Sequence, residues 1–231
     1  MDDTVKGTPQ LAGAATQASA LDETPQGKET GRVEAFSDGV FAIAATLLVL
    51  TLQVPVVTET ARSADLWRAL LRQWPGEVAF VMSFLTILIM WSSHHNIFNH
   101  IRRVDHNFLL LNGLVLMFVS ATPFATELLA RYLDGPAGGA GAGVYAALGL
   151  GISVAYNALW YYASHDRRLL KTDASDEIVA RITRQYRVAP VTFAAAVGLS
   201  FVSAFATVAV FVFIIVWFAV PSAANRGVGE G

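Results

Sequence analysis

Long apolar stretches, separated by short polar ones, dominate the chain from residue 33 onwards. Each of the first four is close to the roughly 20 residues that an α-helix needs to cross the hydrocarbon core of a bilayer. Pro55 ends the first stretch, Pro75 suits the first turn of the second, and Pro123 predicts a kink in the third. The stretches predict four transmembrane helices, at about 33–54, 75–98, 107–129 and 141–163.

A fifth apolar run, from Val188 to Val220, is about 50 Å long as a single helix, which is too long for one crossing and short for two. No charge interrupts it, although Ser200 and Ser203 lie near its middle. We expect two compact helices with a tight reversal near 201–206, and one long tilted helix is the alternative. The whole pattern predicts an all-α, polytopic membrane protein with six transmembrane helices.

Two less apolar segments predict helices outside the hydrocarbon core. Residues 58–73 combine Trp67 and three leucines with three arginines, a pattern typical of a short helix at the membrane interface. Residues 165–187 are polar and carry acidic residues ahead of arginines. We interpret this second segment as a solvated cytoplasmic helix.

Composition supports the membrane class. Hydrophobic residues make up 54% of the chain and charged residues 15%, against about 25% charged in an average globular protein, and the mean hydropathy is +0.48. The 16 Lys and Arg are balanced by 18 Asp and Glu, so there is no basic field and we expect no nucleic-acid partner. The absence of cysteine excludes disulfides, cysteine-ligated metals and thiol catalysis.

The polar residues 1–31 predict a disordered cytoplasmic N-terminal tail and not a signal peptide. A six-helix transmembrane domain is expected over residues 32–221, with a short C-terminal tail over 222–231. Six spans put both termini on one side of the membrane, and the excess of Lys and Arg on that side identifies it as the cytoplasm. The basic residues there are Lys6, Lys28, Arg32, Arg102, Arg103, Arg167, Arg168, Lys171, Arg181, Arg184, Arg187 and Arg226, against Arg62, Arg68, Arg72 and Arg131 on the other side.

The first apolar stretch has a ladder of large side chains on one face. At 100° per residue, Leu47 lies about 40° to one side of Ile43 and Leu50 about 20° to the other, with Thr46 at the edge of the same face. Such ladders commonly pack against neighbouring helices or lipid. Periodicity alone therefore leaves packing and pore lining both open.

Asp38 lies near the cytoplasmic end of the same stretch, where a carboxylate is costly unless it is solvated or paired. One interpretation is a first-turn carboxylate that satisfies free N–H groups and the helix dipole. The other is a functional carboxylate with a basic partner. Candidate partners are Arg32, Arg102, Arg103 and His94.

The first stretch opens with the pattern R-x-x-x-F-S-D, formed by Arg32, Phe36, Ser37 and Asp38. This pattern resembles the first helix of the bacterial and lysosomal potassium channels of the transmembrane protein 175 family. Similar residues follow at the end of the second helix, in the loop after it and in the third helix. They are Trp91, His94, His95, Phe98, Arg102, Arg103, Asp105, Asn112, Ser120 and Pro123. The resemblance is clear over about 32–130 and continues over 140–220 in hydropathy.

The resemblance implies a homotetrameric channel in the bacterial plasma membrane, in which the first helix of each six-helix subunit lines a central pore. It places the constriction at Ile43, with Leu47 and Leu50 further along the pore and Thr46 beside them. Arg32 and the Ser37–Asp38 pair would anchor the cytoplasmic end of the helix. Their implied partners are His94 or Asn112.

A pore lined by isoleucine implies a particular mechanism. Four isoleucines offer a cation no ligand, so potassium, which holds its water less tightly than sodium, should pass more easily, with modest selectivity and gating by dewetting. Nothing like the carbonyl filter sequence T-V-G-Y-G occurs in the chain. Family members often carry an acidic residue just after the ladder, whereas this chain has Thr51-Leu52-Gln53-Val54.

Other functions remain as alternatives. His94, His95 and His100 with Asp105 are too few for a histidine-box enzyme, because that class needs many more ligands, and we interpret them as interfacial residues. No P-loop, dinucleotide fingerprint or hydrolase triad is visible, so we expect no enzyme and no cofactor beyond permeant K⁺. A proton- or cation-coupled transporter that uses Asp38 as its carrier carboxylate remains open. The expected partners are the lipid bilayer, monovalent cations and further copies of the chain.

Overall fold

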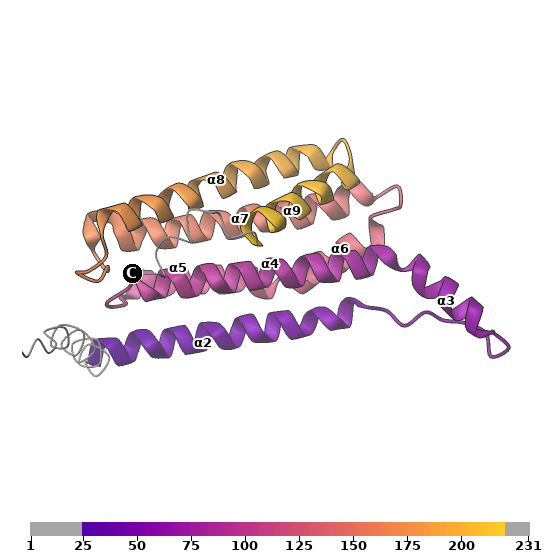
Figure 1. Cartoon of the computed structure of the whole chain (residues 1–231), viewed down its shortest axis with the longest axis horizontal. Helices are drawn as coiled ribbons and strands as arrows, with labels where there is room; N and C mark the ends of the chain where they lie inside the picture. The colour runs from indigo at the N-terminus through magenta and orange to yellow at the C-terminus, as the bar shows by residue number, and fades with distance from the viewer. Residues whose placement is uncertain (1–24, 220–231) are drawn as a thin grey trace, which may run out of the picture.

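The described part of the chain, residues 25–219 of a computed structural model, is built from helices that run side by side (Figure 1). It contains no β-strand beyond one isolated bridge between Ile101 and Leu170. Side chains are described for residues 27–216. The helices in chain order are α2 (Pro25–Leu47), η1 (Leu48–Thr51), α3 (Ser63–Arg72), α4 (Trp74–Asn99), α5 (His106–Ser120), α6 (Thr122–Tyr132), α7 (Gly138–Ser164), η2 (His165–Arg167), α8 (Asp176–Ser200) and α9 (Ala204–Ala219).

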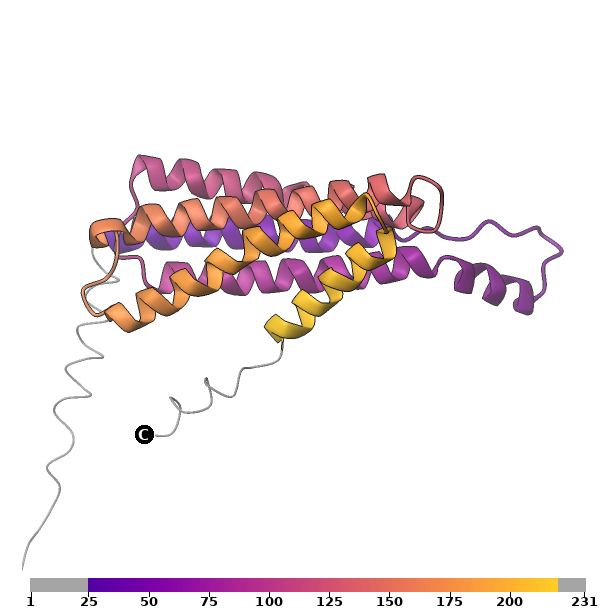
Figure 2. The same cartoon turned by 90° about the horizontal axis from the view of Figure 1, so that it is seen from above.

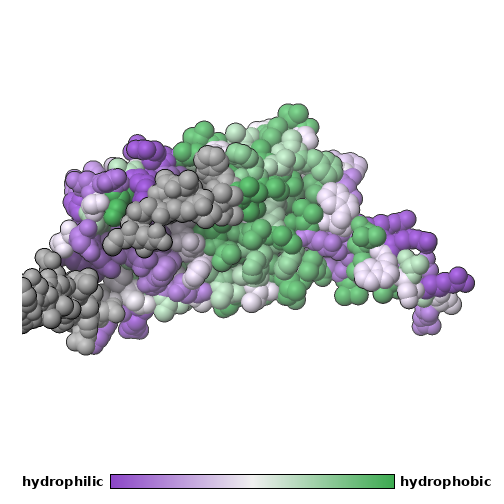
Figure 3. Space-filling view, viewed as in Figure 1, coloured by the Kyte–Doolittle hydropathy of each residue, from purple (hydrophilic) through white to green (hydrophobic). Residues whose placement is uncertain are grey.

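Four helical stretches of the described residues are long and apolar enough to cross a membrane. They are Gly27–Thr51, Trp74–Asn99, His106–Tyr132 and Gly138–Arg167, in agreement with the first four predicted spans. On the face that Figure 3 shows, apolar residues form a band between polar ends. The third stretch consists of α5 and α6, which meet at Ala121, because Pro123 cannot donate the next backbone hydrogen bond.

The last apolar run forms two helices, and the alternative of one long tilted helix is wrong. α8 ends at Ser200, and the backbone N–H groups of Val202 and Ser203 both donate to the carbonyl of Leu199. α9 then turns back alongside α8 (Figure 2). The apolar part of α9, Ala204–Val216, is shorter than the four spans above, so six crossings stay a prediction.

Two predicted boundaries are wrong. α2 begins at Pro25, so residues 25–31 are helical and not a disordered tail. Of the predicted helix over 165–187, residues 165–167 form η2 and 168–175 are not helical, while 176–187 are the first half of α8, which runs without a break from Asp176 into the apolar residues beyond 187. Both differences have one cause: a helix that is already nucleated extends into polar sequence at little cost. Residues 1–24 and the expected tail at 222–231 lie outside the described residues.

α7 holds the bundle together by packing against α5, α6, α8 and α9. Its glycines allow close approach: a Cβ at Gly149 would lie 2.8 Å from the Phe193 ring of α8, and one at Gly151 would lie 2.7 Å from the Phe118 ring of α5. These two positions exclude larger residues unless the rings move. Close contact between helices of this kind is how membrane helices gain packing energy without a hydrophobic driving force.

Pro190 lies inside α8 and cannot donate a backbone hydrogen bond to the carbonyl of Tyr186. The side-chain amide of Asn157, on α7, donates to that carbonyl at 2.7 Å and to the carbonyl of Ser153 at 2.8 Å. Asn157 therefore satisfies the acceptor that proline leaves free. This contact fixes the position of α8 along the axis of α7.

Candidate functional site

α2 has a buried face and an exposed face. Phe41, Ala44 and Leu48 are at most 2% exposed and pack into the core of the subunit. Ile43, Leu47 and Leu50, the predicted ladder, are 61%, 42% and 74% exposed. The ladder thus lies on the side of α2 and η1 that the rest of the described chain leaves uncovered.

The last turn of this helix is wound more tightly than the α-helix that the sequence predicts. η1 is a 3₁₀ helix, and the Thr51 hydroxyl donates to the carbonyl of Leu48 at 2.7 Å within it. Side chains three residues apart eclipse in a 3₁₀ helix, so Leu50 lies more nearly in line with Leu47 than in an ideal α-helix. The exposed Thr46 hydroxyl donates to the carbonyl of Ile43 at 2.9 Å.

A buried chain of hydrogen bonds ties the N-terminal part of α2 to α5 and α4. The Asn112 side-chain N–H donates to the Ser37 hydroxyl at 3.0 Å, and Ser37 in turn donates to the carbonyl of Val33 at 2.8 Å. The remaining amide oxygen of Asn112 lies 2.8 Å from Nε2 of His94. An amide oxygen only accepts, so Nε2 of His94 is the donor. Ser37 and His94 are fully buried and Asn112 is 3% exposed, so these three side chains serve one another and not the solvent.

Asp38 has a partner that the sequence analysis did not propose. Its carboxylate accepts from the indole N–H of Trp91 on α4 at 2.9 Å, and not from His94 or an arginine. The first-turn interpretation is also wrong, because α2 begins at Pro25 and the backbone N–H groups around Asp38 already bond within the helix. Trp91 is placed for this bond by α4, which packs against α2.

A second contact between the same helices lies beside the first. Nδ1 of His95 is 2.9 Å from a carboxylate oxygen of Glu34, and the His95 ring stacks on Trp91 with 6.0 Å between ring centroids. The sequence did not indicate Glu34 as a partner of His95, because Glu34 occupies a position that the R-x-x-x-F-S-D pattern leaves free. Arg32 and Phe36, by contrast, are exposed on the subunit surface.

A carboxylate from elsewhere in the fold lies close to the segment that follows the ladder. Glu127, on α6, accepts from the side-chain amide of Gln53 at 3.1 Å. Glu127 also pairs with Arg131 at 2.7 Å, one turn further along α6. Sequence reasoning could not find this carboxylate, because 74 positions separate it from Gln53.

The histidines do not gather around a common point. His94 bonds to Asn112, His95 to Glu34, and His100 to the carbonyl of Asn96. Asp105 caps α5 by accepting from the Phe108 N–H and also accepts from the hydroxyl of Tyr162. Within the described residues, no three His, Asp or Glu side chains are arranged to hold a metal ion.

Comparison with known proteins identifies this arrangement. The family model for the endosomal/lysosomal potassium channel TMEM175 matches residues 32–123. A potassium channel from Chamaesiphon minutus is 46% identical over 200 residues, which cover 87% of this chain and 98% of the relative. A potassium channel from Streptomyces collinus is 44% identical over 183 residues, covering 78% of this chain and 87% of the relative.

The fold agrees with a solved structure of the same family. The crystal structure of a lysosomal potassium-selective channel TMEM175 homolog from Chamaesiphon minutus superposes with a TM-score of 0.75 at 45% sequence identity. The superposition covers 83% of this chain and 97% of that one. Similarity of this extent, in sequence and in fold, shows that the chain belongs to the TMEM175 family.

Proposed function

We propose that the chain forms a potassium-permeable channel in which four copies of α2 surround a central pore. The observation that carries this proposal is the exposed ladder of Ile43, Leu47 and Leu50 on a helix whose opposite face is buried in its own subunit. The names of the relatives from Chamaesiphon minutus and Streptomyces collinus, both potassium channels, support the same function.

Ile43 is the proposed constriction. A ring of four isoleucines replaces none of the water that a cation loses, so the cation with the weaker hydration shell passes more easily. Potassium is therefore favoured over sodium, but only modestly, because the ring holds no oxygen ligand that fits one ion better than the other. The same ring closes the pore when it dewets.

The polar contacts of α2 support this arrangement by holding the helix from one side. The bonds Asn112–Ser37, Trp91–Asp38 and His95–Glu34 all connect α2 to α4 or α5. A helix fixed in rotation by three such contacts presents a constant face to the axis. The proposal further includes six crossings, a homotetramer, and both termini in the cytoplasm of a bacterial cell.

The test is cation flux into proteoliposomes that contain the purified full-length protein, compared between wild type and Ile43→Asn. The asparagine hydrates the constriction, so we expect the potassium preference over sodium to fall toward unity. Val212→Asn is the matched control, because Val212 is an exposed apolar residue of α9, away from α2. An unchanged preference in Ile43→Asn, or an equal change in both variants, contradicts the proposal, as does a monomeric mass in detergent.

A further inference from the structure

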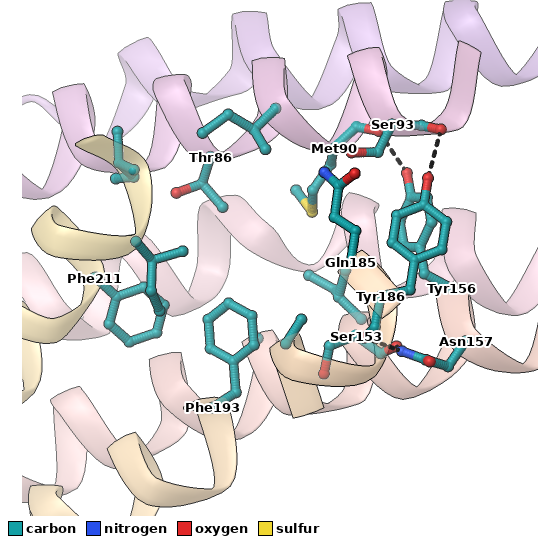
Figure 4. Close-up of a pocket in the computed structure, with 16 residues that line it drawn as sticks. Thr86, Met90, Ser93, Ser153, Tyr156, Asn157, Gln185, Tyr186, Phe193 and Phe211 are labelled. Carbon is teal, nitrogen blue, oxygen red and sulfur yellow. Dashed lines mark hydrogen bonds between the residues drawn. The ribbon is translucent and has the colours of Figure 1, made fainter. Parts of the chain in front are cut away.

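A cavity of about 100 Å³ lies between α4, α7, α8 and α9. It is on the opposite side of α4 from the polar contacts between α4 and α2 that are described above. It opens to the outside of the bundle. Figure 4 shows that its two ends differ: the rings of Phe193 and Phe211 lie at one end, and Gln185, Tyr186 and Asn157 gather at the other.

The two tyrosines and the asparagine in its wall already have partners within the protein. The Tyr156 hydroxyl donates to the carbonyl of Met90 at 2.7 Å, and the Tyr186 hydroxyl donates to the carbonyl of Ser93 at 3.1 Å. The side-chain amide of Asn157 donates to backbone carbonyls of α7 and α8. Beside Ala189 and Phe193, where the wall is apolar, an occupant therefore gains packing and not hydrogen bonds, which suits a hydrocarbon chain.

The α8 wall continues beyond the cavity toward the polar end of the bundle. Arg181, Gln185, Ala189 and Phe193 are spaced four residues apart, so they form one row on the helix surface. In order, the row offers a cation, an amide, a methyl group and an aromatic ring. Arg181 is exposed, and it makes no ion pair with any carboxylate of the described residues.

We propose that the cavity and the row from Arg181 to Phe193 together form a groove that binds one anionic phospholipid of the cytoplasmic leaflet. Its phosphate pairs with Arg181, its ester region lies at Gln185, and one acyl chain enters the cavity between Ala189 and Phe193. The match is one of charge and polarity along the row, since the cation lies at the end where a headgroup would be and the apolar wall lies at the depth of the acyl chains. Anionic headgroups gain about 1 kcal/mol per nearby Lys or Arg, which corresponds to about fivefold in binding.

The experiment is native mass spectrometry of the purified full-length protein, incubated in detergent with phosphatidylglycerol and phosphatidylcholine that carry the same acyl chains. Wild type should retain phosphatidylglycerol preferentially. Arg181→Gln should lower its retention about fivefold and leave phosphatidylcholine unchanged. Ala189→Phe should lower retention of both lipids, because the ring fills the entrance to the cavity.

Arg187→Gln is the matched control. It removes the same charge from the same helix, about 120° around from Arg181 on the side away from Gln185, and should bind as wild type does. The proposal is overturned if wild type shows no headgroup preference, or if the two arginine variants lose retention equally. It is also overturned if Ala189→Phe changes the number of subunits in the same spectra and not the lipid retention, because the groove would then be an interface between copies of the chain.

Discussion

Replacing Asn112 with leucine removes both hydrogen bonds that join α5 to α2 and α4 while keeping a side chain of similar size. The substitution affects the two partners of Asn112 unequally. Ser37 keeps its bond to the carbonyl of Val33, whereas His94 is left fully buried with neither ring nitrogen paired, because Nδ1 has no partner among the described residues. Hydrogen bonds between membrane helices contribute about 0.6 kcal/mol on average and up to about 1.7, so the two together are worth about 1–3 kcal/mol.

The measurement is thermal unfolding of the purified protein in detergent, followed by the amount that still elutes as folded protein. At about 2–4 °C per kcal/mol for a chain of this size, Asn112→Leu should melt about 2–12 °C below wild type. Asn99→Leu, which replaces an exposed asparagine at the end of α4, should stay within about 0.5 kcal/mol of wild type. Adding Ser37→Ala to Asn112→Leu should cost less than Ser37→Ala alone, because the shared bond is already lost. Equal melting of Asn112→Leu and Asn99→Leu would refute the reasoning.

Three further predictions test single contacts. Asp38→Asn keeps an oxygen for the indole N–H of Trp91, so passive, voltage-driven potassium flux in proteoliposomes should persist, whereas a coupled transporter would lose its flux. Asn157→Leu leaves the carbonyl of Tyr186 unpaired and should lower the free energy of unfolding by about 1–3 kcal/mol in the same melting assay. Glu127→Gln removes a carboxylate next to the end of the ladder and should reduce single-channel potassium current at low salt, with currents equal to wild type at high salt, because salt screens the lost charge.

Local patterns predicted the helices well, because each depends on residues that are neighbours in sequence. The first four spans follow directly from runs of about 20 apolar residues, and the split of the last run follows from its length. The exposure of the Ile43 ladder agrees with the helical periodicity, since Phe41 and Ala44 fall on the opposite face and are buried. Only the η1 turn departs from that periodicity, and no residue type in Leu48–Thr51 signals a 3₁₀ helix.

Contacts between helices were predicted less well, because they depend on how the helices are rotated against each other. The family resemblance pointed to His94 or Asn112 as the anchor, and in the structure Asn112 bonds to Ser37 while His94 bonds to Asn112. It implied the same two partners for Asp38, and charge suggested His94 or an arginine, although the actual donor is the neutral Trp91. Charge is a poor guide here because an indole N–H placed by a packed helix needs no counter-ion to hold a carboxylate.

In the proposed arrangement, the two faces of α2 separate stability from conduction. Phe41 and Leu48 are at most 2% exposed, so shortening either leaves a cavity in the subunit and lowers its stability. Ile43, Leu47 and Leu50 contribute little to that core, so their size and polarity are free to be set by what the uncovered face contacts. Lipid would accept any apolar residue at these positions, whereas a pore at the four-fold axis is sensitive to the volume of each side chain. Ile43→Val should therefore leave the subunit as stable as wild type and still alter ion flux if the ladder lines a pore, and should alter neither if it faces lipid.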